Sequence, residues 1–263
     1  MRSNPLVTEV LAGLSRSGKA HLDYLGLLAL QAVVLFLWWP KIGVAQMLES
    51  QHGPHTLAAV VMAVGVTTAY FALRVGAEEV LLPGQHGLRD WALATPLGVG
   101  RVLSGYVLGQ LVHSLYLLAL SSPLLLMAFT VSGGEWVALG WCLGAVLIQA
   151  MFYRLCGSIT HLTIGQHRGE SYFTVRAILL LIYVPVGWLA PLASHIALTS
   201  RLLGESAATQ PAFAAVRAEA VFLAAYAGLS VLATIALHRL LARAQRGMAG
   251  PRDGAAFGKA VTS

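Results

Sequence analysis

A segment near the N-terminus almost spells a phosphate-binding loop. Residues 13–20 read GLSRSGKA, which follows the GxxxxGK[ST] pattern up to its last position, where Ala20 has no hydroxyl for a magnesium ion. No β-strand pattern precedes the segment, and no strand–helix–strand unit follows it. A basic helix that ends near Gly18 is the simpler interpretation. We therefore expect no nucleotide-binding site in this chain, so any nucleotide energy must come from another one.

Glu78 and Glu79 are the only adjacent carboxylates, and such a pair could act as acid and base. Intramembrane proteases of the CAAX-processing type carry a Glu-Glu pair followed by arginine and by membrane-embedded histidines. Here Pro83 stands where that arginine would fall, and the pair lies at the edge of an apolar segment. We expect a polar helix end at this place. An intramembrane protease or lipid-modifying enzyme that uses Glu78-Glu79 is the less favoured alternative.

Nine histidines could serve as metal ligands, but none shows HExxH spacing or lies in a Cys/His cluster, so we expect no metal site. His113 and Gln110 lie close together in one apolar segment, and Gln149 lies in the next. Polar residues within a membrane usually face the interior of the helix bundle or a cavity. Gln110, His113 and Gln149 are therefore candidates for a translocation path, with hydrogen bonding between helices as the alternative.

The composition is that of a membrane protein. Of the 263 residues, 57% are hydrophobic and only 11% are charged, whereas soluble domains carry roughly 25% charged residues. The formal net charge is +6, which agrees with the Lys and Arg enrichment of cytoplasmic loops in membrane proteins. Basic residues are not interleaved with aromatic residues on any soluble stretch, so we expect no nucleic-acid partner.

The apolar segments predict an all-α membrane protein with six transmembrane helices. The Leu and Val residues after Asn4-Pro5 recur at helical spacing, which predicts an amphipathic helix over 4–20 in the membrane interface. The fifth span holds Pro185 and Pro191, which predict a broken or re-entrant helix. The predicted spans are 24–39, 56–73, 102–129, 136–159, 175–198 and 215–240.

Charge bias predicts the orientation. With the N-terminus inside, 14 of the 17 Lys and Arg residues fall on inner segments, and only Lys41, Arg201 and Arg217 fall outside. This bias predicts that both termini are cytoplasmic. We expect one transmembrane domain over 1–246 and a disordered cytoplasmic tail over 247–263.

The stretch 74–110 is the longest interruption between strongly apolar segments. Pro83-Gly84 is typical of a turn, and 87–94 can form barely two helical turns before Thr95-Pro96 ends them. The pattern predicts a short cytoplasmic helix, fixed at both ends, between the second and third spans. Such a helix suits docking to a partner better than catalysis.

The chain resembles the permease subunits of type-2 ABC exporters over nearly its whole length. The N-terminal amphipathic helix, the six spans and the break in the fifth span all match that family. Tyr106 stands where the family usually has lysine at the start of the third span. The segments that carry the match are Asn4-Pro5-Leu6, LRDWALATPL at 88–97 and Val102-Leu103-Ser104-Gly105.

The resemblance implies that the chain is not itself an enzyme and holds no cofactor. It would be the permease of an ATP-driven exporter in a bacterial inner membrane, and segment 87–97 would be its coupling helix. Its partners would be two copies of a cytoplasmic ATPase, which bind ATP and Mg, a second permease in a homodimer or heterodimer, and membrane lipid. A non-transporting anchor or assembly subunit of an ABC-type complex is the first alternative. The implied ATPase contacts are Leu88, Arg89, Asp90, Trp91, Thr95 and Pro96.

Overall fold

The part of the chain that the computed structural model describes is almost entirely helical. The structure describes residues 5–16, 18–41, 55–78, 87–95, 97–132, 135–164, 173–174, 177, 199, 203 and 212–249. No strand occurs among these residues, as the sequence predicted. The helices are α1 (Pro5–Arg16), α2 (Gly18–Leu37), α4 (His55–Glu78), α5 (Leu88–Ala94), α6 (Val99–Ser132), α7 (Trp136–Ile164) and α10 (Ala212–Ala249).

Five of these helices are long and apolar enough to cross a membrane, which makes the chain a multi-pass membrane protein. Each coincides with one of the predicted spans, and the predicted fifth span, 175–198, lies almost entirely outside the described residues. α10 continues to Ala249, three residues into the segment predicted as a tail (247, 248 and 249); residues 250–263 are outside the described part. The five apolar stretches are Ala20–Leu37, His55–Ala77, Val99–Ser132, Trp136–Thr163 and Ala220–Arg246.

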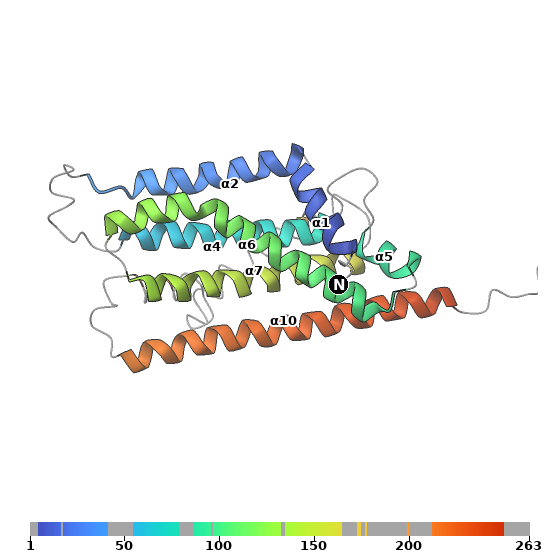
Figure 1. The fold of residues 1–263 in the computed structure, drawn as a ribbon. Coiled ribbons are helices and arrows are strands. Elements are labelled where there is room, and N and C mark those ends of the chain that lie inside the picture. Colours follow the sequence, from blue (N-terminus) through green and yellow to red (C-terminus); the bar gives the residue numbers. More distant parts are fainter. Residues whose placement is uncertain are drawn as a thin grey trace, which may run out of the picture.

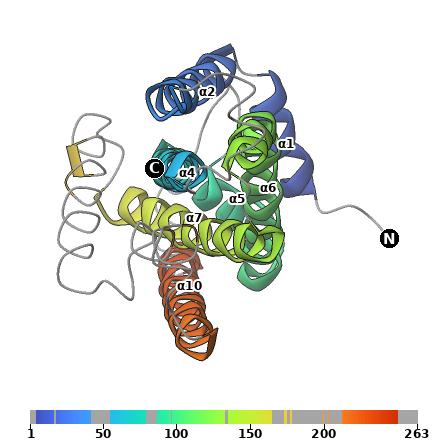
Figure 2. The ribbon, with the colours of Figure 1, turned by 90° about the vertical axis from the view of Figure 1, so that its left-hand side faces the viewer.

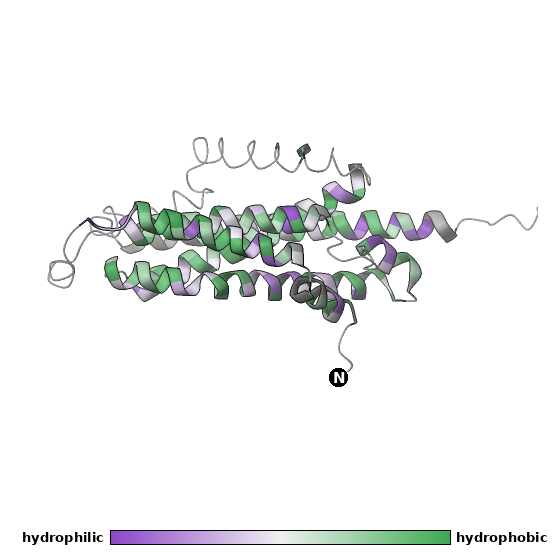
Figure 3. Cartoon of the chain, turned by 90° about the horizontal axis from the view of Figure 1, so that it is seen from above, coloured by the Kyte–Doolittle hydropathy of each residue, from purple (hydrophilic) through white to green (hydrophobic). Residues whose placement is uncertain are grey.

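The five long helices lie side by side, and α1 and α5 lie at one end of the bundle, which we call the α5 end (Figure 1). α2 and α6 begin at the α5 end, whereas α4 and α7 finish there (Figure 1). α10 begins at the opposite end, so its basic C-terminal turns also reach the α5 end (Figure 1). Figure 3 shows hydrophilic residues on these last turns, where α10 projects beyond the other helices.

α4 is the central helix of the described bundle. Its apolar span is 67% buried within the chain, against 22% for the span of α10. α4 packs on α7, α6 and α2, and the end-on view shows it enclosed by these three helices (Figure 2). The span of α10 is the least buried of the five, and those of α2 and α6 follow at 28% each, so these three helices expose more of their spans than α4 and α7 do.

Two glycines allow α4 and α7 to approach closely. A Cβ added to Gly157 of α7 would overlap the carbonyl oxygen of Leu73 and lie 2.8 Å from the backbone nitrogen of Ala77. A Cβ on Gly76 of α4 would overlap the carbonyl oxygen of Arg154. Small residues at an interface let helix backbones meet in this way. The α4–α7 contact is therefore the tightest helix pair for which the structure gives such distances.

α1 is shorter than the helix predicted over 4–20. It ends at Arg16, and α2 begins at Gly18, six residues before the predicted start of the first span at residue 24. Polar residues at the start of α2 are accommodated because Arg74 of α4 forms an ion pair with Asp23 at 3.0 Å. The next residue, Tyr24, packs with Ala20 and Leu27 of α2 against side chains of α4 and α6.

Candidate functional site

α5 is a seven-residue helix that local hydrogen bonds close at both ends. The backbone of Gly87 is extended before the helix begins, and its N–H donates to Asp90 Oδ2 at 3.1 Å. At the other end, the Thr95 hydroxyl donates to the carbonyl oxygen of Trp91 at 2.6 Å. A helix of this length is marginal by itself in water. Its caps and its packing therefore have to hold it in place.

The two faces of α5 differ in exposure. Leu88 and Ala92 are only 3% and 1% exposed, and they pack in a cluster with side chains of α6 and α10. Arg89 and Asp90 are exposed, and Trp91 is half-buried. One face of α5 thus rests on the bundle, and the other is open.

Two hydrogen bonds from distant helices secure α5. The Trp91 indole Nε1 donates to Glu9 Oε2 of α1 at 2.7 Å. Gln245 Nε2 near the end of α10 donates to the carbonyl oxygen of Ala92 at 2.5 Å. Together with the packing on α6, these contacts tie α5 to three helices.

The residues predicted to contact an ATPase therefore have different surroundings. Arg89 and Asp90 are the two that lie open to solvent. Leu88 faces the bundle, Trp91 bonds to α1, and Thr95 bonds within α5. Pro96 lies outside the described residues.

A network of buried polar side chains joins α2, α6 and α7 inside the bundle. Arg154 of α7 is 3% exposed and His113 of α6 is 2% exposed. Arg154 NH1 lies 2.6 Å from His113 Nδ1, and Tyr24 of α2 places its hydroxyl 3.2 Å from His113 Nε2. A guanidinium can only donate, so His113 Nδ1 accepts. The remaining imidazole proton then lies on Nε2 and is donated to Tyr24, which makes His113 neutral in this arrangement.

The network continues along α6 and α7 toward the α5 end. Ser158 Oγ donates to the carbonyl oxygen of Arg154 at 3.2 Å, and the Tyr106 hydroxyl is hydrogen-bonded to Ser158 Oγ. Gln110 lies on the same side of α6, between Tyr106 and His113. It is fully buried, and neither atom of its amide has a hydrogen-bond partner among the described residues. Buried amides without partners are costly, so Gln110 marks a place where a polar group could be accepted.

Gln149 belongs to a different contact from Gln110 and His113. Its Nε2 donates to the Tyr226 hydroxyl of α10 at 3.3 Å. Gln149 and Arg154 are five residues apart on α7, which places them about 140° apart around the helix. Of the three residues predicted for a translocation path, Gln110 and His113 lie on the same side of α6, and only His113 is shown in contact with Arg154. Gln149 lies between α7 and α10.

Sequence reasoning missed the buried position of Arg154, which was counted only as one of the basic residues on inner segments. Its place inside a predicted span was the available signal, because a charged side chain among apolar residues usually needs partners within the bundle. The partnership of Glu9 with Trp91 was also missed, and no local pattern signals it.

The alternative sites gain little from the structure. Glu78 is the last residue of α4, and Glu79 lies outside the described residues. Segment 13–20 spans the end of α1 and the start of α2, with Ser17 outside the described residues, and is otherwise helical. Within the described part, no three His, Cys, Asp or Glu side chains gather where they could hold a metal ion.

Comparisons of the chain with models of protein families, with curated proteins and with solved structures find no match.

Proposed function

We propose that this chain is the permease subunit of an ATP-driven ABC exporter and that α5 is its coupling helix. In this proposal the α5 end faces the cytoplasm of a bacterial cell, and two copies of a separate ATPase bind there. The ATPases bind ATP and Mg, and this chain carries out no catalysis. A second permease, of this sequence or a related one, completes the membrane-spanning unit.

The observation that carries the proposal is the pair of opposite faces on α5. A helix that transmits motion needs one face for the partner and another fixed to the parts that must move. Arg89 and Asp90 offer charged groups to a partner. Leu88 and Ala92 pack on α6 and α10. A displacement of α5 would therefore reach the membrane helices directly.

The motion would reach different helices through different contacts. The Trp91–Glu9 hydrogen bond leads to α1, which packs on α6. The Gln245 hydrogen bond leads to α10. Thr95 is only four residues before the start of α6 at Val99, so α6 receives the motion through the chain as well. α6 and α10 are thus the helices that we expect to tilt when α5 moves.

The buried network would then be a closed section of the path. His113 of α6 is hydrogen-bonded to Arg154 of α7, so we expect a tilt of α6 relative to α7 to break this bond. Hydrogen bonds to charged groups contribute about 1.5–3 kcal/mol. Breaking the bond would free donors and acceptors of His113 and Arg154 for polar groups of a passing substrate.

The experiment is co-purification of the ATPase with tagged chain from detergent-solubilised membranes of the native host. Wild type is compared with Arg89→Glu and with Lys41→Glu, which reverses an exposed charge beyond the far end of α2. We expect a P-loop ATPase to co-purify with wild type and with Lys41→Glu. With Arg89→Glu, the amount of co-purified ATPase should fall at least tenfold. Absence of any ATPase from the wild-type preparation would contradict the proposal.

A second measurement separates an exporter from a non-transporting anchor. Both would bind the ATPase, but only an exporter couples its hydrolysis to a path through the bundle. In proteoliposomes, we expect His113→Ala to change substrate-stimulated ATPase activity while ATPase binding stays at the wild-type level. An unchanged rate in this variant would favour the anchor.

A further inference from the structure

We propose that the outward face of the last turns of α10 binds the headgroups of anionic phospholipids. The surface consists of Arg239, Arg243 and Arg246, and we call it the α10 basic face. The inference concerns the membrane and does not rest on the ATPase proposal.

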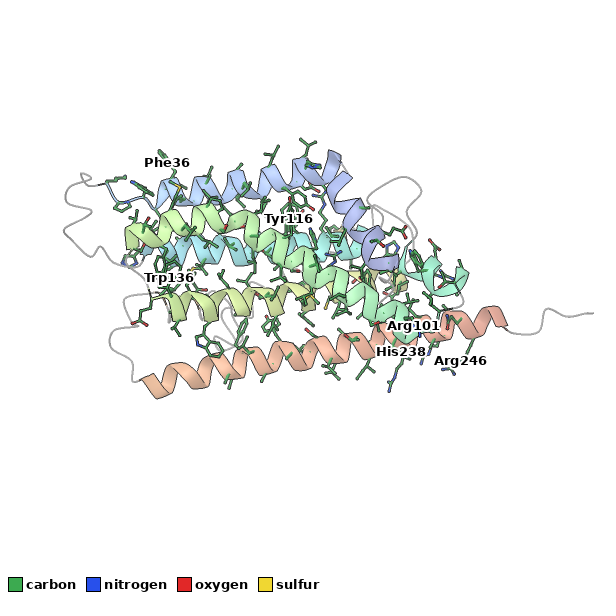
Figure 4. All side chains as sticks on the ribbon, viewed as in Figure 1. Phe36, Arg101, Tyr116, Trp136, His238 and Arg246 are labelled. Carbon is green, nitrogen blue, oxygen red and sulfur yellow. The ribbon has the colours of Figure 1, made fainter. Side chains whose placement is uncertain are left out.

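The register of α10 places the three arginines on the side that faces away from the other helices. Leu237 and Leu241 are 0% and 1% exposed and pack in the cluster with α5 and α6. Arg239 and Arg243 each follow one of these leucines by two residues, which is about 200° around a helix. Figure 4 shows the side chains of His238 and Arg246 extending from α10 away from the bundle.

The same outward stripe of α10 changes from apolar to basic along its length. Val231, Leu232 and Ile235 are 58%, 63% and 44% exposed, as expected of side chains that meet lipid tails. His238 and Arg239 follow on that stripe and are also exposed, and Arg243 and Arg246 continue it. The face that contacts acyl chains therefore becomes cationic without turning toward another helix.

The spacing places Arg239 at headgroup depth, with Arg243 and Arg246 about one and two turns further out. At 1.5 Å per residue, Arg239 lies about 6 Å beyond Ile235 along the helix axis, and Arg243 lies about 12 Å beyond it. The polar layer on each side of a bilayer is about 5–8 Å thick, and Arg side chains reach along the helix toward it. Phosphate groups suit the planar guanidinium because it can donate two parallel hydrogen bonds. Arg101, exposed at the first turn of α6, adds charge of the same sign at this end (Figure 4).

The test uses native mass spectrometry of the full chain in neutral detergent, titrated with phosphatidylglycerol and, in parallel, with phosphatidylcholine. Arg239→Gln should weaken phosphatidylglycerol binding about fivefold, and the triple Gln variant about a hundredfold. Phosphatidylcholine binding should not change. Lys41→Gln, which removes one exposed charge at the other end of the bundle, should leave both lipids bound as in wild type.

A triple Lys variant guards against misfolding, because it keeps the charge and should retain most of the phosphatidylglycerol preference. Equal affinity of wild type for the two lipids would overturn the proposal. So would a triple Gln variant that binds phosphatidylglycerol normally. If the triple Gln variant kept its phosphatidylglycerol binding but no longer co-purified with an ATPase, the α10 basic face would be a protein-docking surface.

Discussion

The α5 end and the buried polar network both join separate helices through single side-chain hydrogen bonds, but they differ in exposure. At the α5 end, half-buried Trp91 meets Glu9 of α1, and Arg89 beside it is exposed. In the network, His113 and Arg154 are almost completely buried. A hydrogen bond in the low-dielectric interior is electrostatically stronger, and losing one partner is costlier there. The network is therefore suited to hold one arrangement of the helices, and the α5 end is suited to receive a partner.

The largest effect on stability should come from the helix pair that supports the network. Gly157→Ala places a Cβ against the backbone of Leu73 and Ala77 in α4, and backbone atoms cannot turn aside as a flexible side chain could. We expect a loss of about 3 kcal/mol in the free energy of unfolding, measured by thermal or denaturant unfolding in detergent.

Gly140→Ala is the matched control on the same helix, because a Cβ there meets nothing within 4 Å. It should leave the free energy of unfolding unchanged or raise it slightly, since alanine favours helix more than glycine does. Equal destabilisation by both substitutions would contradict the close α4–α7 contact.

Removing the central group of the network should have the next largest effect. His113→Ala takes away the acceptor of Arg154 NH1 and the partner of the Tyr24 hydroxyl. We expect a loss of about 2 kcal/mol in the free energy of unfolding, measured by denaturant unfolding in detergent, because two buried polar groups lose a partner. The control is His238→Ala on the exposed side of α10, which should change stability by less than about 0.5 kcal/mol.

A smaller loss in the free energy of unfolding should follow when only Tyr24 of the network is changed. Tyr24→Phe keeps the aromatic ring and removes one hydroxyl, so we expect a loss of about 1 kcal/mol. Tyr116→Phe is the natural comparison, because Tyr116 contacts the ring of Tyr24 edge-on but is 48% exposed. A larger effect for Tyr116→Phe than for Tyr24→Phe would argue against the hydrogen bond to His113.

The smallest effect on stability should come from the exposed face of α5. Arg89→Glu changes an exposed side chain on a helix held by its other face, so the free energy of unfolding should change by less than about 0.5 kcal/mol. The same variant should co-purify with much less of the partner ATPase than wild type does. A variant that is strongly destabilised would show that Arg89 supports the fold and is not available to a partner.

Much of the described fold could be predicted because it follows from local sequence. Long apolar runs predict the helices α2, α4, α6, α7 and α10. The turn and proline signals around 87–96 predict a short helix, and α5 begins one residue later than the prediction, at Leu88. The predicted helix over 4–20 runs four residues past the end of α1 at Arg16, because the apolar pattern does not distinguish α1 from α2, which begins at Gly18.

Contacts between distant segments could not be predicted in the same way. Tyr24 and Arg154 are 89 and 41 residues from His113 in the chain, and only the packing of three helices brings them together. Gly140 and Gly144 have the GxxxG spacing that is typical of a close helix contact, yet a Cβ at either position would meet nothing within 4 Å. Within the described chain, that contact is made instead by Gly76 and Gly157, one on each of two helices. A spacing motif does not specify which helix faces it.

The most direct test of the coupling-helix account is site-specific photo-crosslinking in native membranes. A photoreactive phenylalanine analogue is placed at position 89 on the exposed face of α5, and at position 41 as the control. The account predicts a crosslink to a P-loop ATPase from position 89 and none from position 41. The absence of an ATPase crosslink from position 89, or crosslinks of equal yield from both positions, would contradict it.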